Sequence, residues 1–276
     1  MPTVWPIDNF ERTWALHAVA LAGLLRHPRL ADAVDHQLDL LHASHTACGI
    51  GMSDHFRADG DITATATAVL ALAGRQADMT AVDRFRHEDH YRTYPDELQP
   101  SLTTTAHALH AHALHAHMLH TNTTGLRGAR TAHGLRFLRD RQSPDGRWHG
   151  DKWHSSWIYT TAQVVISLPT TPATRRGIDA LLNAQLPDGG WGTHHRATAG
   201  ETGYATLALH KAAPRTPDIA AALEQAGAWL TAWQETSSAC SCDLWIGKEL
   251  YCPTRIDRTV AHAALIAATH HTQTRA

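Results

Sequence analysis

A segment that occurs twice constrains the fold of this chain more than any other feature of its sequence. The pattern Leu-x-x-x-Gln-x-x-Asp-Gly-x-Trp occupies residues 138–148 and returns at residues 181–191, displaced by 43 residues. A repeat of this length indicates stacked pairs of helices. In each copy we expect a helix that ends at the Gln, a Pro-Asp-Gly turn, and a Trp whose indole packs back on the helix end. The Gln amide can bond backbone groups there, so we interpret the repeat as a structural staple.

Apolar residues recur at helical spacing along almost the whole chain, and no alternating strand pattern extends beyond a few residues. The sequence therefore predicts an all-α protein, folded as a single domain over residues 1–276. Consecutive helix pairs suggest a ring of inner and outer helices, an α/α toroid whose inner face encloses a cavity. The spacing predicts eleven helices, at about residues 8–25, 30–46, 61–73, 78–86, 101–120, 127–142, 156–168, 173–185, 200–212, 217–233 and 254–270.

The charge balance of the chain argues against nucleic acid as a partner. The chain has 24 Lys and Arg against 26 Asp and Glu, a formal net charge of -2, so it offers no basic surface for nucleic acid.

No apolar run approaches the roughly 20 residues that span a bilayer, and residues 1–10 lack the basic and apolar regions of a signal peptide. Four cysteines in 276 residues suit a reducing compartment. We therefore expect a soluble, cytoplasmic protein with no membrane span.

Histidines and cysteines raise the question of a metal site. Three of the 23 histidines share one face of a predicted helix without the i,i+4 pairing of a His-Glu-x-x-His site: His107, His110 and His115. We interpret this helix as solvated or partner-facing, with a metal site as the less favoured alternative. Cys240, Cys242 and Cys252 could ligate zinc, but no second pair has the spacing of a zinc ribbon. We therefore predict no tightly bound metal.

Two carboxylates stand where an Ala/Thr/Leu-rich helix is expected to begin. Asp59 and Asp61 flank Gly60, and the small residues that follow suit close packing on the inside of a ring. On the residues alone two interpretations stay open. In the first, Asp59 caps the helix and Asp61 is a first-turn acid stabilised by the helix dipole. In the second, the pair carries chemistry.

The surrounding motifs resemble those of one enzyme family. The stretch from Asp59 to Ala64 resembles the Asp-x-Asp-Asp-Thr-Ala motif of class II terpene cyclases. Residues 5–24 resemble the segment just upstream of it in diterpene cyclases of the bacterial copalyl diphosphate synthase type. The two Gln-to-Trp repeats are similar to the QW motifs of that family. Further similar segments follow in the family's order, at residues 90–95, 151–156, 201–205 and 244–251, so the resemblance covers nearly the whole chain.

This resemblance implies that Asp61 is the general acid and Asp59 its neighbour. Protonation of an isolated alkene needs a strong, well-placed acid and an apolar site that keeps it protonated. A neighbouring carboxylate helps by making a second negative charge unfavourable. The chain departs from the motif at its last acid, where it has Ile62. That change could weaken the acid or alter how it regains its proton.

The resemblance also implies a substrate. A linear prenyl diphosphate, geranylgeranyl diphosphate first and farnesyl diphosphate second, would be protonated and folded into a bicyclic product that keeps its diphosphate. This is an isomerase-type intramolecular cyclisation, and Mg2+ would enter only with the diphosphate. Cations suit the diphosphate and aromatic rings suit the carbocation. The candidate substrate-binding residues are Lys152, Lys248, Arg92, Trp153, Trp157, Tyr159 and Trp245.

In the family a helical γ domain accompanies the β domain, and this chain resembles the β domain alone. Eleven predicted helices instead of twelve fit an incomplete α6/α6 barrel. An apolar face left without its neighbour would need a cover, so we expect a γ-domain-like partner subunit or a second copy of this chain. The alternative function is a non-catalytic toroid subunit that binds a hydrophobic ligand or a cyclase partner.

Overall fold

The structure is a computed structural model that describes residues 7–118, 126–236, 244–246 and 250–273. It separates into two compact units, each described here by itself. Unit 1 comprises Met1–Ala20 and Leu24–Asp140, and unit 2 comprises Leu21–Gly23 and Arg141–Ala276. Within the described ranges, no helix is long and apolar enough to cross a membrane. The single domain expected over residues 1–276 stays a prediction.

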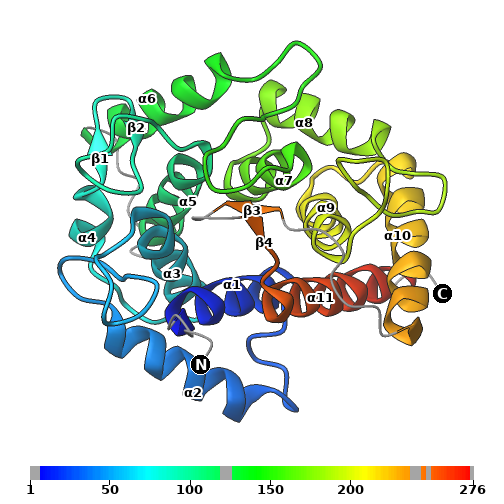
Figure 1. Ribbon diagram of the computed structural model, residues 1–276, viewed down its shortest axis with the longest axis horizontal. Coiled ribbons are helices and arrows are strands. Elements are labelled where there is room, and N and C mark those ends of the chain that lie inside the picture. Colours follow the sequence, from blue (N-terminus) through cyan, green and yellow to red (C-terminus); the bar gives the residue numbers. More distant parts are fainter. Residues whose placement is uncertain (1–6, 119–125, 237–243, 247–249, 274–276) are drawn as a thin grey trace. The chain divides into compact units, whose positions relative to one another are not determined.

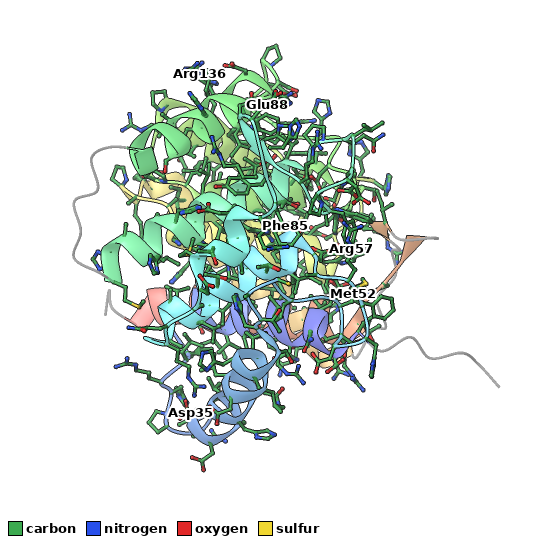
Figure 2. The ribbon with its side chains drawn as sticks, turned by 90° about the vertical axis from the view of Figure 1, so that its left-hand side faces the viewer. Asp35, Met52, Arg57, Phe85, Glu88 and Arg136 are labelled. Atoms are coloured by element: carbon green, nitrogen blue, oxygen red, sulfur yellow. The ribbon has the colours of Figure 1, made fainter. Side chains whose placement is uncertain are left out.

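Unit 1 is built around two buried helices that pack side by side, α3 and α5 (Figure 1). Helix α4 packs against both, and α6 and the strand β2 pack against α5. Phe85 lies inside the unit, whereas Asp35 and Arg136 lie at its outer edges (Figure 2). The elements are α1 (Asp8–Leu21), α2 (Ala31–Ser44), α3 (Gly60–Leu72), α4 (Met79–Asp83), β1 (Arg86–His87), β2 (His90–Tyr91), α5 (Leu102–Met118) and α6 (Leu126–Asp140).

Unit 2 places one buried helix, α9, against two others, α7 and α11 (Figure 1). Helix α10 packs on α9 and α11, and α8 packs on α7. Strand β3 also pairs with the segment before α7, where His154 bridges to Trp245. The elements are α7 (Trp157–Ser167), α8 (Pro172–Asn183), α9 (Ala199–Lys211), α10 (Pro217–Thr236), β3 (Trp245–Ile246), β4 (Leu250–Tyr251) and α11 (Thr254–Gln273).

All eleven expected helices are confirmed, and their described ends lie close to the expected ones. The sequence did not indicate the two antiparallel strand pairs, in which Arg86 pairs with Tyr91 and Trp245 with Tyr251. Strands of two residues are too short to show an alternating pattern, so periodicity does not detect them.

The two Gln-to-Trp repeats form the staples that the sequence predicts. Gln142 donates from Nε2 to the carbonyl of Gly146 at 2.8 Å, and Gln185 donates to the carbonyl of Gly189 at 2.9 Å. The same nitrogens also reach the next outer helix, at Ala173 in α8 and Ala222 in α10. Each Gln therefore links its own turn to the following outer helix, α8 for Gln142 and α10 for Gln185. The indoles of Trp148 and Trp191 are fully buried.

A second repeat, which the sequence analysis missed, locates the start of four buried helices. In each of α3, α5, α7 and α9 a Thr hydroxyl near the first turn accepts the backbone N–H of a residue from the preceding segment. These contacts measure 2.9 to 3.0 Å and join Thr63 to Ile50, Thr105 to Tyr91, Thr161 to Trp148 and Thr202 to Trp191. Since a buried hydroxyl needs a partner, this arrangement explains why the buried helices are rich in Thr.

Candidate active site

The Asp59-Gly60-Asp61 triplet forms the start of α3. Asp59 is the N-cap, and its Oδ1 accepts the backbone N–H groups of Asp61 at 2.8 Å and Ile62 at 3.0 Å. Its own N–H donates to the carbonyl of Ile50 at 2.9 Å. The first of the two open interpretations is therefore right about the cap, because Asp59 satisfies helix donors that would otherwise lack a partner.

Gly60 is required by the close approach of a neighbouring segment. Its N–H donates to the carbonyl of Thr93 at 2.8 Å. A Cβ at this position would lie 2.4 Å from the Arg92 carbonyl oxygen and 2.8 Å from the ring of Phe85. Any side chain would push the backbone of residues 92–93 away, so the glycine fixes the spacing of the two acids.

The Asp61 carboxyl contacts a histidine from another helix. Its Oδ1 lies 2.7 Å from Nδ1 of His107 in α5, and the two side chains are 9% and 1% exposed. Among the described residues, the carboxyl receives one further contact, a long one of 3.5 Å from the Thr103 hydroxyl to Oδ2. The pair is thus a buried carboxyl hydrogen-bonded at one oxygen by an imidazole, with its other oxygen weakly engaged.

The charge of the site is concentrated on two adjacent carboxyls. Burial, followed by the nearby Asp61 carboxyl, raises the pKa of Asp59 to about 7, against the opposing effect of hydrogen bonds from two backbone N–H groups and the Tyr94 hydroxyl. Burial and the Asp59 charge likewise raise the pKa of the Tyr94 phenol. Asp59 can therefore gain or lose a proton near neutral pH, and its protonation depends on the state of Asp61.

The interpretation of the α5 histidines as solvated or partner-facing is wrong for His107 and His110, which are 1% and 4% exposed. The signal that could have placed them inside is the run of small residues from Thr103 to Ala111, which matches the composition of α3. His107 stands one helical turn after Thr103 and so shares its face. Ile62, in place of the motif's last acid, is buried as well.

Unit 2 brings together two of the expected aromatic residues. Tyr159 and Trp245 have ring centroids 5.1 Å apart, and His154 stacks on Tyr159 at 4.0 Å. With Tyr204 these rings line a small cavity that has room for about one water molecule. Two carboxyl groups, Glu201 and Asp257, also line this cavity.

Trp153 and Trp157 are not part of that cluster. The Lys152 ammonium lies 5.1 Å from the ring centroid of Trp153, and the Arg147 guanidinium lies 4.1 Å from that of Trp157. A ring face that already contacts a protein cation is poorly suited to bind a carbocation, because the like charges repel. A contact with a carbocation therefore stays a prediction for all four rings, and Trp153 and Trp157 are the less suitable ones.

Sequence reasoning missed the acids of unit 2 as a group. Glu201, in the first turn of α9, accepts hydrogen bonds from the Ser156 hydroxyl at 2.6 Å, the Thr193 hydroxyl at 2.6 Å and the Thr198 hydroxyl at 2.9 Å. Burial, opposed by a hydrogen bond from Trp245, raises the pKa of Asp257 to about 7. The signals at Glu201 were the family-like segment at residues 201–205 and the cap pattern Thr198-x-x-Glu201, and neither indicates which residues the acid contacts.

Of the three expected diphosphate ligands, Arg92 lies in unit 1 and Lys152 in unit 2. Arg92 donates from Nη1 to the Pro95 carbonyl at 3.3 Å, and its buried Nε has no hydrogen-bond partner. Lys152, in unit 2, is half-buried against Trp153. Lys248 lies outside the described residues.

The α5 histidines and the cysteines are side chains whose type suits a metal ion. Within residues 7–118, 126–236, 244–246 and 250–273, no group of three or more His, Cys, Asp or Glu side chains could hold a metal ion. Cys240 and Cys242 lie outside these ranges.

Comparison with known proteins identifies the family. The family model of the squalene-hopene cyclase C-terminal domain matches residues 49–242. The (+)-kolavenyl diphosphate synthase of Herpetosiphon aurantiacus is 38% identical over 98% of this chain and 50% of its own length. The copalyl diphosphate synthase of Streptomyces cyslabdanicus is 35% identical over 99% of this chain and 51% of its own length. The chain thus spans about half the length of these curated relatives.

A solved structure supports the same assignment. The ent-copalyl diphosphate synthase of Streptomyces platensis matches with a TM-score of 0.86 and 31% identity, over 98% of this chain and 52% of that one. This match confirms the expected fold class, the α/α toroid of the class II terpene cyclases. Fold, motif order and family model agree, and the chain belongs to the family of the squalene-hopene cyclase C-terminal domain.

Proposed function

We propose that this chain carries the proton donor of a class II terpene cyclase, which protonates a linear prenyl diphosphate and cyclises it with the diphosphate retained. Asp61 gives its proton to the terminal alkene. The internal double bonds then close the rings, and the final carbocation loses a proton or captures water. The proposal is supported by family membership and by the names of the relatives, which are synthases of kolavenyl diphosphate and copalyl diphosphate.

The contact between Asp61 and His107 carries the proposal. A hydrogen bond donated by Nδ1–H to Oδ1 stabilises the carboxylate that remains after proton transfer, which makes the acid stronger in the transition state. The proton to be delivered then belongs on Oδ2, the oxygen with only the long Thr103 contact. One oxygen thus holds the acid in place and the other reacts.

Asp59 acts on the acid through its charge and its backbone contacts. Its carboxyl accepts the Asp61 N–H and so fixes the first turn of α3. The Asp61 carboxyl in turn raises the pKa of Asp59, because two adjacent negative charges repel. Asp59 is therefore a positioning residue in this proposal, and Asp61 is the acid.

For the substrate we propose geranylgeranyl diphosphate first and farnesyl diphosphate second. Lys152, Lys248 and Arg92 are the proposed diphosphate ligands, and any Mg2+ accompanies the diphosphate rather than a protein site. Tyr159 and Trp245 are the proposed aromatic contacts of the carbocation. We also propose that a γ-domain-like partner, or a second copy of the chain, contributes to the active site.

The test is product formation by the purified chain with each diphosphate, alone and with a separately produced γ-like subunit. Turnover that Asp61→Asn abolishes supports the proposal. The matched control is the pair formed by Asp83 and His112, also an Asp and an α5 histidine, 3.1 Å apart. Asp83→Asn should leave turnover unchanged.

Two results would count against the proposal. Equal loss of turnover in the Asp61 and Asp83 variants would point to folding rather than acid chemistry. Tight binding of the diphosphates without product, in every combination, would instead support the non-catalytic binding subunit.

A further inference from the structure

The hairpin formed by β1 and β2 places two histidines side by side. The turn Glu88-Asp89 joins the strands, and His87 pairs with His90 across the ladder. Residues directly opposite each other in an antiparallel pair lie on the same face of the ribbon. The two imidazole rings accordingly have their centroids 5.2 Å apart. The sequence His-Glu-Asp-His thus folds into a turn with both imidazoles on one face.

Each of these imidazoles has a buried ring nitrogen whose hydrogen-bonding capacity is not used. Among the described residues, neither Nδ1 of His87 nor Nε2 of His90 has a hydrogen-bond partner, and His90 is only 9% exposed. A buried polar atom without a partner costs free energy, so two such atoms on neighbouring rings need an explanation. A bound ligand that contacts both nitrogens would supply one.

The other nitrogen of His90 shows which kind of ligand fits. Its Nδ1 lies 3.0 Å from Oδ1 of Asp89, so the neutral ring carries its hydrogen on Nδ1 and a lone pair on Nε2. Burial, opposed by Asp89, lowers the pKa of His90 and so favours this neutral form. A histidine that binds a metal ion usually donates its second nitrogen to a carboxylate, which orients the ring. His90 has this arrangement.

The separation of the rings suits a single tetrahedral ion. Zn2+ binds imidazole nitrogen at about 2.0–2.1 Å, which places two imidazoles on one tetrahedral ion with their centroids about 5 Å apart. The observed 5.2 Å agrees with that spacing. Arg92 lies near enough to His90 to affect its charge, and the two acids of the turn, Glu88 and Asp89, offset this positive charge.

The turn lies where an ion from solvent reaches it. Figure 2 shows Glu88 at the outer edge of unit 1, and both acids of the turn are exposed. His87 is half-buried, whereas the ring of His90 stacks on Phe137 of α6 at 5.0 Å. One imidazole is therefore held by packing, and the other lies between it and solvent.

We propose that His87 and His90 bind one Zn2+, or a similar divalent transition-metal ion, through Nδ1 and Nε2 respectively. Water fills the remaining positions, so the affinity is lower than that of a zinc site with four protein ligands. The ion would also stabilise the segment after β2, where the Thr93 carbonyl accepts the Gly60 N–H. This inference is independent of the proposed function.

The test is calorimetric titration with Zn2+ of the purified chain without a polyhistidine tag. We expect one ion per chain, bound more weakly by about tenfold or more in His87→Gln and in His90→Gln. Asp89→Asn should weaken binding by about tenfold, because an amide orients the His90 ring less strongly. The matched control is His194→Gln, which alters the exposed neighbours His194 and His195 and should leave the affinity unchanged.

A second measurement keeps the proposal testable if a variant folds poorly. Nuclear magnetic resonance of the unaltered chain, labelled with 15N at histidine, should show Zn2+ shifting Nδ1 of His87 and Nε2 of His90 before any other ring nitrogen. Equal Zn2+ affinity in the unaltered chain and the hairpin variants would overturn the proposal, because the ion would then bind other histidines. Shifts at other ring nitrogens first, or no binding of a single ion, would overturn it as well.

Discussion

The two units hold similar sets of residues in opposite electrostatic settings. Unit 1 has Asp59 and Asp61 with His107, and unit 2 has Glu201 and Asp257 with His154. In unit 1 the imidazole contacts a carboxyl at 2.7 Å. In unit 2 the imidazole instead accepts the Ser156 N–H at Nδ1, and burial lowers the pKa of His154 to about 3.

The difference lies in where each carboxyl finds its hydrogen-bond donors. Glu201 is surrounded by hydroxyl and backbone donors from Ser156, Thr193 and Thr198, which hold its side chain in one orientation. Asp61 has one strong donor, and that donor can itself exchange protons. The same residue types therefore hold the start of α9 against its neighbouring loops in unit 2, whereas in unit 1 they leave the Asp61 carboxyl with one strong donor.

The largest expected effect compares one acid from each unit. Asp61→Asn should lower turnover by about 10³-fold or more, because an amide cannot donate a proton to an alkene. Asp257→Asn should lower turnover by about tenfold at most, since this carboxyl accepts a hydrogen bond from Trp245 but is not the proposed acid. Steady-state product formation measures both, and a comparable loss in Asp257→Asn would remove the distinction between the units.

The second comparison replaces one buried imidazole in each unit by Gln. His107→Gln should lower turnover by about 10²-fold while the melting temperature changes little, because Gln can still donate to Asp61 but cannot carry a proton. His154→Gln should change turnover little and should lower the free energy of unfolding by about 1–3 kcal/mol, because the ring packing of His154 is lost. Turnover and thermal unfolding of both variants check this. A purely thermal effect of His107→Gln would speak against its chemical role.

The third comparison concerns two glycines. Gly60→Ala should destabilise the protein by about 2–4 kcal/mol, because the new Cβ would lie 2.4 Å from the Arg92 carbonyl oxygen. Gly227→Ala in α10, whose Cβ would meet its nearest atom at 3.5 Å, should be neutral or stabilising by up to about 1 kcal/mol. Denaturant unfolding of both variants gives the difference, and equal effects would show that the close approach at Gly60 can relax.

The smallest expected effect is a pH dependence in unit 2. The pKa of Asp257 is raised in the folded state to about 7, so the folded chain binds more protons at this group than the unfolded chain between about pH 4 and 7. Stability from this group is therefore present at low pH and is lost as the pH rises through 7. Asp257→Asn should flatten that decline by a few kcal/mol at most, since one pKa unit is about 1.4 kcal/mol. Unfolding at pH 5 and pH 8 measures it, and a decline that persists in the variant would assign it to other groups.

Local patterns predicted the helices and staples because both depend on neighbours in sequence. The helix periodicity and the Gln-to-Trp spacing needed no tertiary information, and both are confirmed. The motif resemblance also located Asp61, whose surroundings the structure describes as buried. Its role as the acid stays a proposal.

Contacts between distant residues could not be derived in the same way. His107 lies 46 positions after Asp61, and its burial depends on how α5 packs against α3. The covering of Trp157 by Arg147 likewise depends on a loop whose path the sequence does not reveal. A polar face on a helix predicts solvent contact when the partner helix is not known, and this is why the sequence predicts a solvated face for His107 and His110, which are buried.

The central claim is that the Asp61 carboxyl delivers a proton from solvent to the substrate alkene. It is tested most directly by incubating the chain, with its γ-like partner if one is required, with geranylgeranyl diphosphate in deuterated water. The account predicts a cyclic diphosphate that carries a single solvent deuterium, formed by the unaltered chain and lost in Asp61→Asn. A cyclic product without deuterium, or one formed equally well by Asp61→Asn, would contradict it.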